Sequence, residues 1–193
     1  MKTIVWDIDD VLNSLMKDWF EQKWLIENSG SLLIYNDIVQ NPPHEVLKIS
    51  FDDYKSSLDV FRTQYGKLLK PVPEIISWFK DYGSNYRHIA LTAVPIPLSP
   101  TSAEWIFTHF GNWIRSFNIV PSRRETDPPF EYYSTKKEFL ESFGKVDLLI
   151  DDNVFNIEGA KELGIKTILF PQPWNNRVFN TPQKSLQMLN EIM

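Results

Sequence analysis

Two clusters of acidic residues have the types and spacing that suit a bound divalent cation. Asp7, Asp9 and Asp10 follow a short apolar run, and Asp151 and Asp152 follow a second apolar run late in the chain. Carboxylates that lie close together repel one another, and an ionised carboxylate among other anions is costly unless a cation joins them. Mg²⁺ would resolve this conflict, because it prefers oxygen ligands in octahedral geometry. The sequence therefore predicts an oxygen-liganded Mg²⁺ site, provided that the fold brings the two clusters together.

The composition narrows the kind of site and of partner. The 193 residues include no cysteine and three histidines, which excludes thiolate-metal sites and disfavours a histidine-rich transition-metal site. A net charge of −5 offers no basic face for a nucleic acid polymer. No apolar run is long enough to cross a bilayer, and the run before Asp7 is too short for a signal peptide. We therefore expect no membrane partner and a cytoplasmic location.

Alternating strands and helices must position the acidic clusters. Short runs rich in β-branched and aromatic residues predict strands, and amphipathic segments between them predict helices. The predicted strands are 3–6, 88–92, 117–120, 146–150 and 166–170, and the predicted helices between and after them are 73–82, 102–116, 135–143, 154–163 and 182–193. This alternation predicts an α/β fold, a three-layer Rossmann-like parallel sheet with helices on both faces. Ligands of such sheets bind at the carboxyl ends of the strands, where Asp7, Thr92 and Asp151 stand.

Residues 13–70 interrupt the alternation. They separate the first two strands by more chain than one crossover helix requires. Segments 14–25 and 52–65 carry apolar residues at helical spacing. We therefore predict a core domain of residues 1–12 and 71–193, with a small helical cap of residues 13–70 inserted after the first strand.

Four motifs, in chain order, resemble those of the haloacid dehalogenase-like (HAD) phosphatase superfamily. They are Asp7-Ile8-Asp9-Asp10-Val11 after the first strand, Thr92 at the end of a hydrophobic strand, a lysine that opens a helix, and the pair Asp151-Asp152. The resemblance implies a phosphomonoester hydrolase that uses Mg²⁺ and an aspartyl-phosphate intermediate. It implies that Asp7 is the nucleophile and a metal ligand. Asp9 would be the general acid and base, and would also bind the metal through its backbone carbonyl.

The resemblance also implies roles for the remaining motif residues. Thr92, Ala93 and a lysine would bind phosphate, Asp152 would bind the metal directly, and Asp151 would support it or be an alternative ligand. Thr135 followed by Glu138 forms a capping box, which places Lys136 at the first helical position. We therefore prefer Lys136 as the phosphate-binding lysine, with Lys137 as the alternative. These residue types also suit phosphoryl transfer on chemical grounds, since the reaction needs a nucleophile, a divalent cation and short cationic or hydrogen-bonding arms.

A narrower resemblance is to the 5′(3′)-deoxyribonucleotidase group. It rests on the opening from Asp7 to Leu12, the cap directly after it, and Gln172-Pro173-Trp174-Asn175 after the last strand. It implies a small phosphorylated substrate, a (deoxy)nucleoside monophosphate. Asn13, Ser14 and Asn176 differ from that group's usual residues.

Three alternative functions share parts of this pattern. The first is a HAD phosphatase of another small phosphorylated metabolite. The second is a receiver-like signalling module, which also combines an acidic pair, a phosphorylated aspartate, a threonine and a lysine, but places the acidic pair after its first strand and lacks a cap. The third is a non-catalytic phosphate-binding protein, because a fold does not by itself establish catalysis.

Overall fold

The central structure is a five-stranded sheet in the order β3-β2-β1-β4-β5, in which every neighbouring pair is parallel. The computed structural model describes residues 1–122, 133–175 and 180–193, so Asn176 lies outside the described residues. The strands are β1 (Thr3–Trp6), β2 (Arg87–Val94), β3 (Ile114–Pro121), β4 (Leu148–Asp151) and β5 (Lys166–Leu169). This all-parallel sheet confirms the predicted α/β fold.

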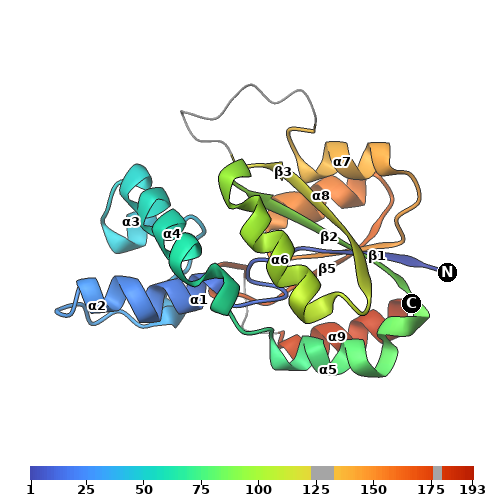
Figure 1. Ribbon diagram of the computed structural model, residues 1–193, viewed down its shortest axis with the longest axis horizontal. Helices are drawn as coiled ribbons and strands as arrows, with labels where there is room; N and C mark the ends of the chain where they lie inside the picture. Colours follow the sequence, from blue (N-terminus) through green and yellow to red (C-terminus); the bar gives the residue numbers. More distant parts are fainter. Residues whose placement is uncertain (123–132, 176–179) are drawn as a thin grey trace.

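Helices cover both faces of the sheet and make three layers (Figure 1). One face carries α7 (Lys136–Phe143) and α8 (Val154–Glu162), and the other carries α5 (Pro73–Tyr82), α6 (Ser99–Phe110) and α9 (Pro182–Ile192). Side chains alternate between the faces of a strand. Val5 of β1 accordingly belongs to the core under α7 and α8, while Ile4 and Trp6 belong to the core shared with α5, α6 and α9. The central strand is therefore buried on both sides.

A helical cap follows β1 and lies beside the sheet in Figure 1, as predicted. Its elements are α1 (Leu15–Trp19), a π-helical turn (Phe20–Trp24), α2 (Leu25–Glu27), a 3₁₀ turn (Tyr35–Asp37), α3 (His44–Leu47), α4 (Phe51–Tyr65) and a second 3₁₀ turn (Gly66–Leu68). The outgoing and returning chains touch through an antiparallel bridge between Asn13 and Pro71. The Val72 N–H also donates to the Leu12 carbonyl at 2.9 Å. The division at residues 12/13 and 70/71 stays a prediction. No helix in the described ranges is both long and apolar enough to span a bilayer.

The predicted limits of the helix 102–116 were wrong at both ends. Because the predicted helix extended to residue 116, the predicted third strand began too late, at residue 117. Helix α6 begins at Ser99, because Pro100 lacks an N–H and fits a first helical turn. It ends at Phe110, and the chain turns so that fully buried Ile114 starts β3 beside β2. Strand β2 also extends past Thr92 to Val94, which places Thr92 inside the strand.

A buried histidine has a structural role at the centre of the sheet. The fully buried Trp6 indole donates from Nε1 to Nδ1 of His88 at 3.0 Å. Because Nδ1 accepts, the ring proton resides on Nε2, which lies 2.8 Å from the Gly83 carbonyl oxygen and donates to it. Burial lowers the pKa of His88 to about 4, so the ring stays neutral at neutral pH.

We expect the folded protein to lose stability on acidification through His88. A histidine with a lowered folded-state pKa stabilises the fold above its unfolded pKa of about 6.5, and this contribution disappears as the pH falls toward 4. Between pH 7 and pH 4.5 the wild type should lose about 2 to 3 kcal/mol more unfolding free energy than His88→Gln, which does not titrate. Urea unfolding of both proteins at the two pH values measures this difference. Equal losses in both would contradict the assigned role.

Candidate active site

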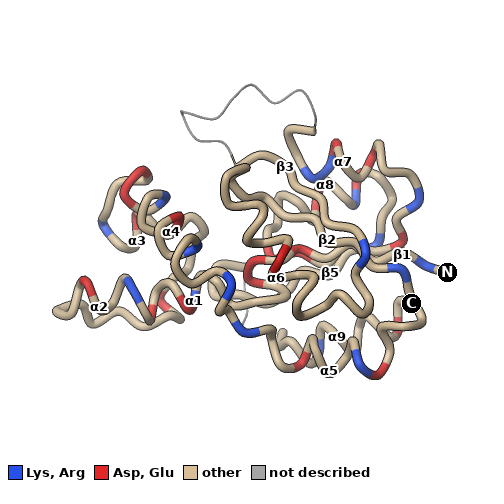
Figure 2. The backbone as a smooth tube through the Cα atoms, in the orientation of Figure 1, with Lys and Arg blue, Asp and Glu red and all other residues tan. Residues whose placement is uncertain are grey.

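Three carboxylates from neighbouring strands meet at the carboxyl edge of the sheet. Asp7 directly follows β1, Asp151 ends β4, and Asp152 is the next residue. The Asp7 N–H donates to the Ile150 carbonyl at 2.9 Å, which extends the pairing of β1 and β4. One carboxylate oxygen from each of Asp7, Asp151 and Asp152 lies within 4.8 Å of the others. Figure 2 shows acidic segments at the sheet edge that faces the cap. Parallel pairing therefore brings the two predicted clusters together.

Lys136 joins two of these carboxylates. Its Nζ lies 2.7 Å from Asp7 Oδ1 and 2.8 Å from Asp151 Oδ2, and its side chain is 2% exposed. Thr135 caps α7 by accepting a hydrogen bond from the Glu138 N–H at 3.2 Å, which makes Lys136 the first helical residue. Lys137 is only partly buried and pairs with a glutamate on α8. Of the two candidate lysines, the structure places Lys136 in the cluster.

Asp151 is fully occupied by protein donors. Besides Lys136, it accepts from the Asn153 N–H at 2.9 Å and from Asn156 Nδ2 at 3.1 Å. Its side chain has no exposed surface. These contacts suit a residue that holds Lys136 in place, and a direct bond from Asp151 to a cation stays a prediction.

Asp7 and Asp152 each keep one oxygen that accepts no hydrogen bond from a described residue. Asp7 Oδ1 accepts from the Ile8 N–H and from Lys136, which leaves Oδ2. Asp152 Oδ2 accepts from Trp174 Nε1 at 2.8 Å, which leaves Oδ1. Both residues are buried, at 7% and 5% exposure. A cation at this edge would find two oriented carboxylate oxygens.

The electrostatics of the cluster favour such a cation. Burial raises the pKa of Asp7 well above its usual value, the charges of Asp151 and Asp152 raise it further, and Lys136 opposes the effect. Burial and the neighbouring Asp151 likewise raise the pKa of Asp152. Burial alone would lower the pKa of Lys136, but the two carboxylates outweigh it and raise the pKa. One lysine thus does not balance the acidic groups, and oxygen-only donors of this kind fit Mg²⁺.

The cluster opens into a cavity of about 260 Å³ between the sheet edge and the cap. Its lining includes all the predicted site residues except Asp151, namely Asp7, Asp9, Thr92, Ala93, Lys136 and Asp152. Thr92 is buried and Ala93 is exposed. Asn41, Tyr54, Leu58 and Arg62 line the cap side. The catalytic and binding roles of the predicted residues stay predictions, but their positions allow all of them except Asp151 to act in one cavity.

The loop after β1 curls around a single carbonyl group. The Ile8 carbonyl oxygen accepts from the N–H groups of Val11, Leu12 and Asn13 at 3.4, 2.9 and 3.2 Å. Asp10 adopts a left-handed conformation with φ of 63°, which aspartate tolerates better than most residues. Its Oδ1 accepts from the Met16 N–H at 2.8 Å, and this contact ties the loop to α1. The tight loop fixes the positions of Asp7 and Asp9.

The turn Gln172–Asn175 connects the two acidic segments. Gln172 Nε2 donates to the Asp10 carbonyl at 2.6 Å. On the other segment, Trp174 donates to the Asp152 carboxylate, and Asn175 Nδ2 donates to the Asp152 carbonyl at 2.6 Å. Sequence reasoning found this turn only as part of a family pattern and assigned it no contact. It found no role for Arg62, whose charge lies on the cap and gives no local signal.

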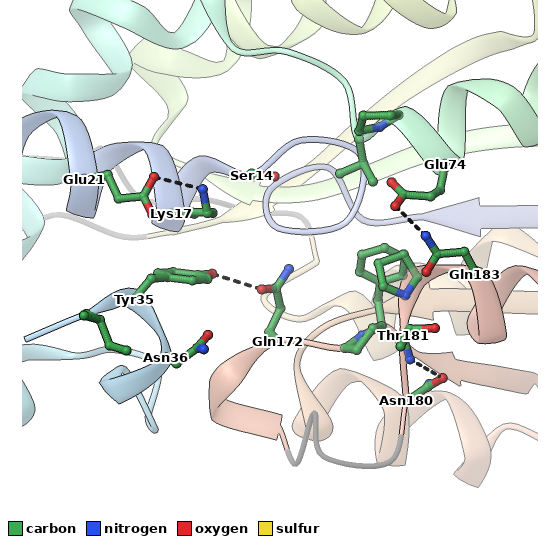
Figure 3. A pocket seen from close by; sticks show the side chains of 16 residues that line it. Ser14, Lys17, Glu21, Tyr35, Asn36, Glu74, Gln172, Asn180, Thr181 and Gln183 are labelled. Atoms are coloured by element: carbon green, nitrogen blue, oxygen red, sulfur yellow. Dashed lines mark hydrogen bonds and ion pairs between the residues drawn. The ribbon is translucent and has the colours of Figure 1, made fainter.

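A larger cavity of about 670 Å³ lies elsewhere, between α1, α5 and the chain that follows β5 (Figure 3). Tyr35 and Gln172 meet at its wall, where the Tyr35 hydroxyl donates to Gln172 Oε1 at 2.9 Å. Its described lining residues include none of the clustered aspartates and neither Thr92 nor Lys136. The smaller cavity, which holds the carboxylates and the lysine, is therefore the candidate active site.

Comparison with known proteins identifies the fold. No family model matches the chain, and no curated protein sequence matches it. Similar solved structures include a haloacid dehalogenase-like family hydrolase from Streptococcus pneumoniae, with 18% identity, a TM-score of 0.59, and coverage of 97% of this chain and 90% of that one. A haloacid dehalogenase-like hydrolase from Xanthomonas campestris has 13% identity, a TM-score of 0.59, and coverage of 100% and 96%. A protein from Clostridium acetobutylicum that is described as a predicted phosphatase has 15% identity, a TM-score of 0.59, and coverage of 98% of both chains. The chain has the fold of haloacid dehalogenase-like hydrolases.

Proposed function

We propose that this chain is a Mg²⁺-dependent phosphomonoester hydrolase that acts through an aspartyl-phosphate on Asp7. The observation that supports it best is the asymmetry of Asp7. Lys136 and the Ile8 N–H hold Oδ1, while Oδ2 has no described donor and Asp7 lines the cavity. A carboxylate held by one oxygen and open at the other suits a nucleophile.

The residues present fit the cation that this chemistry needs. Mg²⁺ would be held by Asp7, Asp152 and the carbonyl oxygen of Asp9. That carbonyl is open to a cation, because no described residue donates a hydrogen bond to it. Bound there, the ion would neutralise the clustered carboxylates and the charge that develops on the transferring phosphoryl group. Lys136, Thr92 and Ala93 would bind the phosphate oxygens, and this assignment is supported by their places in the lining of the same cavity.

The reaction divides into two displacements at phosphorus. In the first, Asp7 Oδ2 forms a bond to phosphorus while the ester oxygen leaves and takes a proton from Asp9. In the second, water attacks phosphorus, Asp9 takes a proton from it, and the bond to Asp7 breaks to release phosphate. Asp9 lines the same cavity as Asp7 and accepts a hydrogen bond from Arg62 of the cap. This position suits transfer of a proton to a leaving group that extends toward the cap.

For the substrate, we propose a (deoxy)nucleoside monophosphate. Support comes from the turn Gln172–Asn175, which connects the acidic segments, and from a cap inserted directly after β1. Asn41, Tyr54 and Leu58 offer polar and apolar contacts to the part of the substrate beyond the phosphate. Another small phosphorylated metabolite is the alternative. The receiver-like interpretation has less support, because the acidic pair follows β4 and a cap is present. A cytoplasmic location stays a prediction.

Mg²⁺ should stabilise the folded protein through Asp152. At a concentration 100-fold above its Kd, a ligand that binds only the folded state adds about 2.7 kcal/mol. We expect Mg²⁺ to raise the melting temperature of the wild type and of Asp81→Asn, a change on the exposed part of α5, but to have little effect on Asp152→Asn. Differential scanning calorimetry with and without Mg²⁺ measures the shifts. An equal Mg²⁺ shift in Asp152→Asn would show that the ion binds elsewhere.

Loss of the nucleophile should abolish turnover. We expect Asp7→Asn to lower Mg²⁺-dependent phosphate release by about 10³-fold or more, as for other catalytic nucleophiles, while Asp81→Asn leaves it unchanged. Phosphate release is measured on a panel of nucleoside monophosphates and sugar phosphates, and circular dichroism checks the fold of each variant. Release from sugar phosphates alone would remove the nucleotide assignment and keep the chemistry. A wild type that releases no phosphate from any phosphomonoester, or an Asp7→Asn variant that retains full activity, would refute the proposed function.

A further inference from the structure

A side chain of the cap reaches the candidate acid and base of the core. Arg62, on α4, donates from Nη2 to Asp9 Oδ2 at 2.9 Å. The Arg62 side chain is 13% exposed and that of Asp9 is 18% exposed, so water screens this ion pair only in part. Charge-assisted hydrogen bonds are roughly twice as strong as neutral ones. The contact joins a cap residue to a core residue 53 positions away, and both residues line the cavity.

The other oxygen of Asp9 is held from the core side. Asn13 Nδ2 donates to Asp9 Oδ1 at 3.1 Å. The Asn13 side chain is itself fixed, because its Oδ1 accepts from the Leu15 N–H at 3.0 Å and from the Asp10 N–H at 3.3 Å. Asn13 also forms the bridge to Pro71, where the chain leaves and re-enters the core. Asp9 is thus held by two hydrogen bonds, one from Asn13 at the bridge between core and cap and one from Arg62 on the cap helix α4.

Arg62 keeps one donor without a partner. Its Nη1 lies 3.4 Å from Asp59 Oδ1, one turn earlier on α4, but its buried Nε–H has no acceptor among the described residues. The Nε–H and a terminal N–H of arginine form a planar fork that matches two oxygens of a carboxylate or phosphate. A buried donor without an acceptor costs about 1–3 kcal/mol. An oxygen of a phosphomonoester in the cavity that Arg62 lines would remove this cost.

We propose that Arg62 is a positioning residue, which orients Asp9 and makes that orientation depend on the cap being seated on the core. The inference rests on the proposed function, in which Asp9 transfers a proton to the leaving group. If the cap moves away, Asp9 keeps only its Asn13 contact and can rotate about its side-chain bonds. A bound substrate that supplies an acceptor for the Arg62 Nε–H favours the seated cap, and with it the aligned position of Asp9.

The test compares substrates that differ in their need for a proton. An alkyl phosphate has a poor leaving group that must be protonated, whereas p-nitrophenyl phosphate releases a stable anion without help. General acid catalysis contributes about 10²–10⁴-fold. We therefore expect Arg62→Gln to lower kcat for the alkyl phosphate by about 100-fold and kcat for p-nitrophenyl phosphate by no more than a few-fold. Arg62→Lys should recover part of the loss.

The matched control is Lys55→Gln, which removes a cation from the same helix. Lys55 pairs with Asp52 and lies over the Phe51 ring, and it does not line the cavity. This variant should keep the wild-type ratio between the two substrates, and thermal melts check that every variant folds. If Arg62→Gln lowers kcat by the same factor for both substrates, Arg62 has a merely structural role. If it lowers kcat for neither substrate, the proposal is also overturned. A wild type that releases phosphate from no phosphomonoester would instead refute the proposed function, and this inference with it.

Discussion

The repulsion among Asp7, Asp151 and Asp152 is the constraint on which the rest of the structure depends. Three buried carboxylates lie within 4.8 Å of one another, although burial and mutual repulsion raise the pKa values of Asp7 and Asp152. Lys136 offsets part of this cost by bonding to two of them. The remaining cost must be carried by the hydrogen-bonded pairing of β1 with β4 and by the apolar cores on both faces of the sheet. Stability is thus exchanged for a dense group of buried charges at the sheet edge, as is common where function needs strained electrostatics.

Supporting contacts around this cluster converge from parts of the chain that are far apart. The turn Gln172–Asn175 bonds to the backbone or side chain of both acidic segments, and Gln172 continues the connection to Tyr35 in the cap. On the opposite side, Arg62 brings a second cap element to Asp9. Residues that bond to the acidic loops therefore set the position of the cap as well. The cap and the acidic cluster form one hydrogen-bonded system, so a change in either is transmitted to the other through a few identifiable bonds.

Local patterns predicted the parts of the structure that local forces determine. Helix α5 matches its predicted limits, because Pro73 suits the first turn and the apolar spacing continues to Tyr82. Thr135 placed the start of α7, and with it Lys136, through its cap. The limits of α6 were missed, because burial of Ile114 in the sheet outweighs the helical spacing there. Arg62 and Trp174 were missed as contacts of the site, since each acts on a residue far away in sequence and carries no periodic signal. Their contacts exist only in the folded chain.

The place of β1 in the middle of the sheet has a consequence for biosynthesis. This strand is made before β4, which is one of its two partners, and the Thr3 N–H bonds to an Asp147 carboxylate that is 144 residues away in sequence. Pairings of such long range are slow, because the entropy of closing a long loop must be overcome before any contact is gained. A ribosome-bound chain therefore has to hold the apolar strand β1 unpaired on that side until β4 has emerged. Such an edge is prone to aggregation, and chaperones commonly shield segments of this kind.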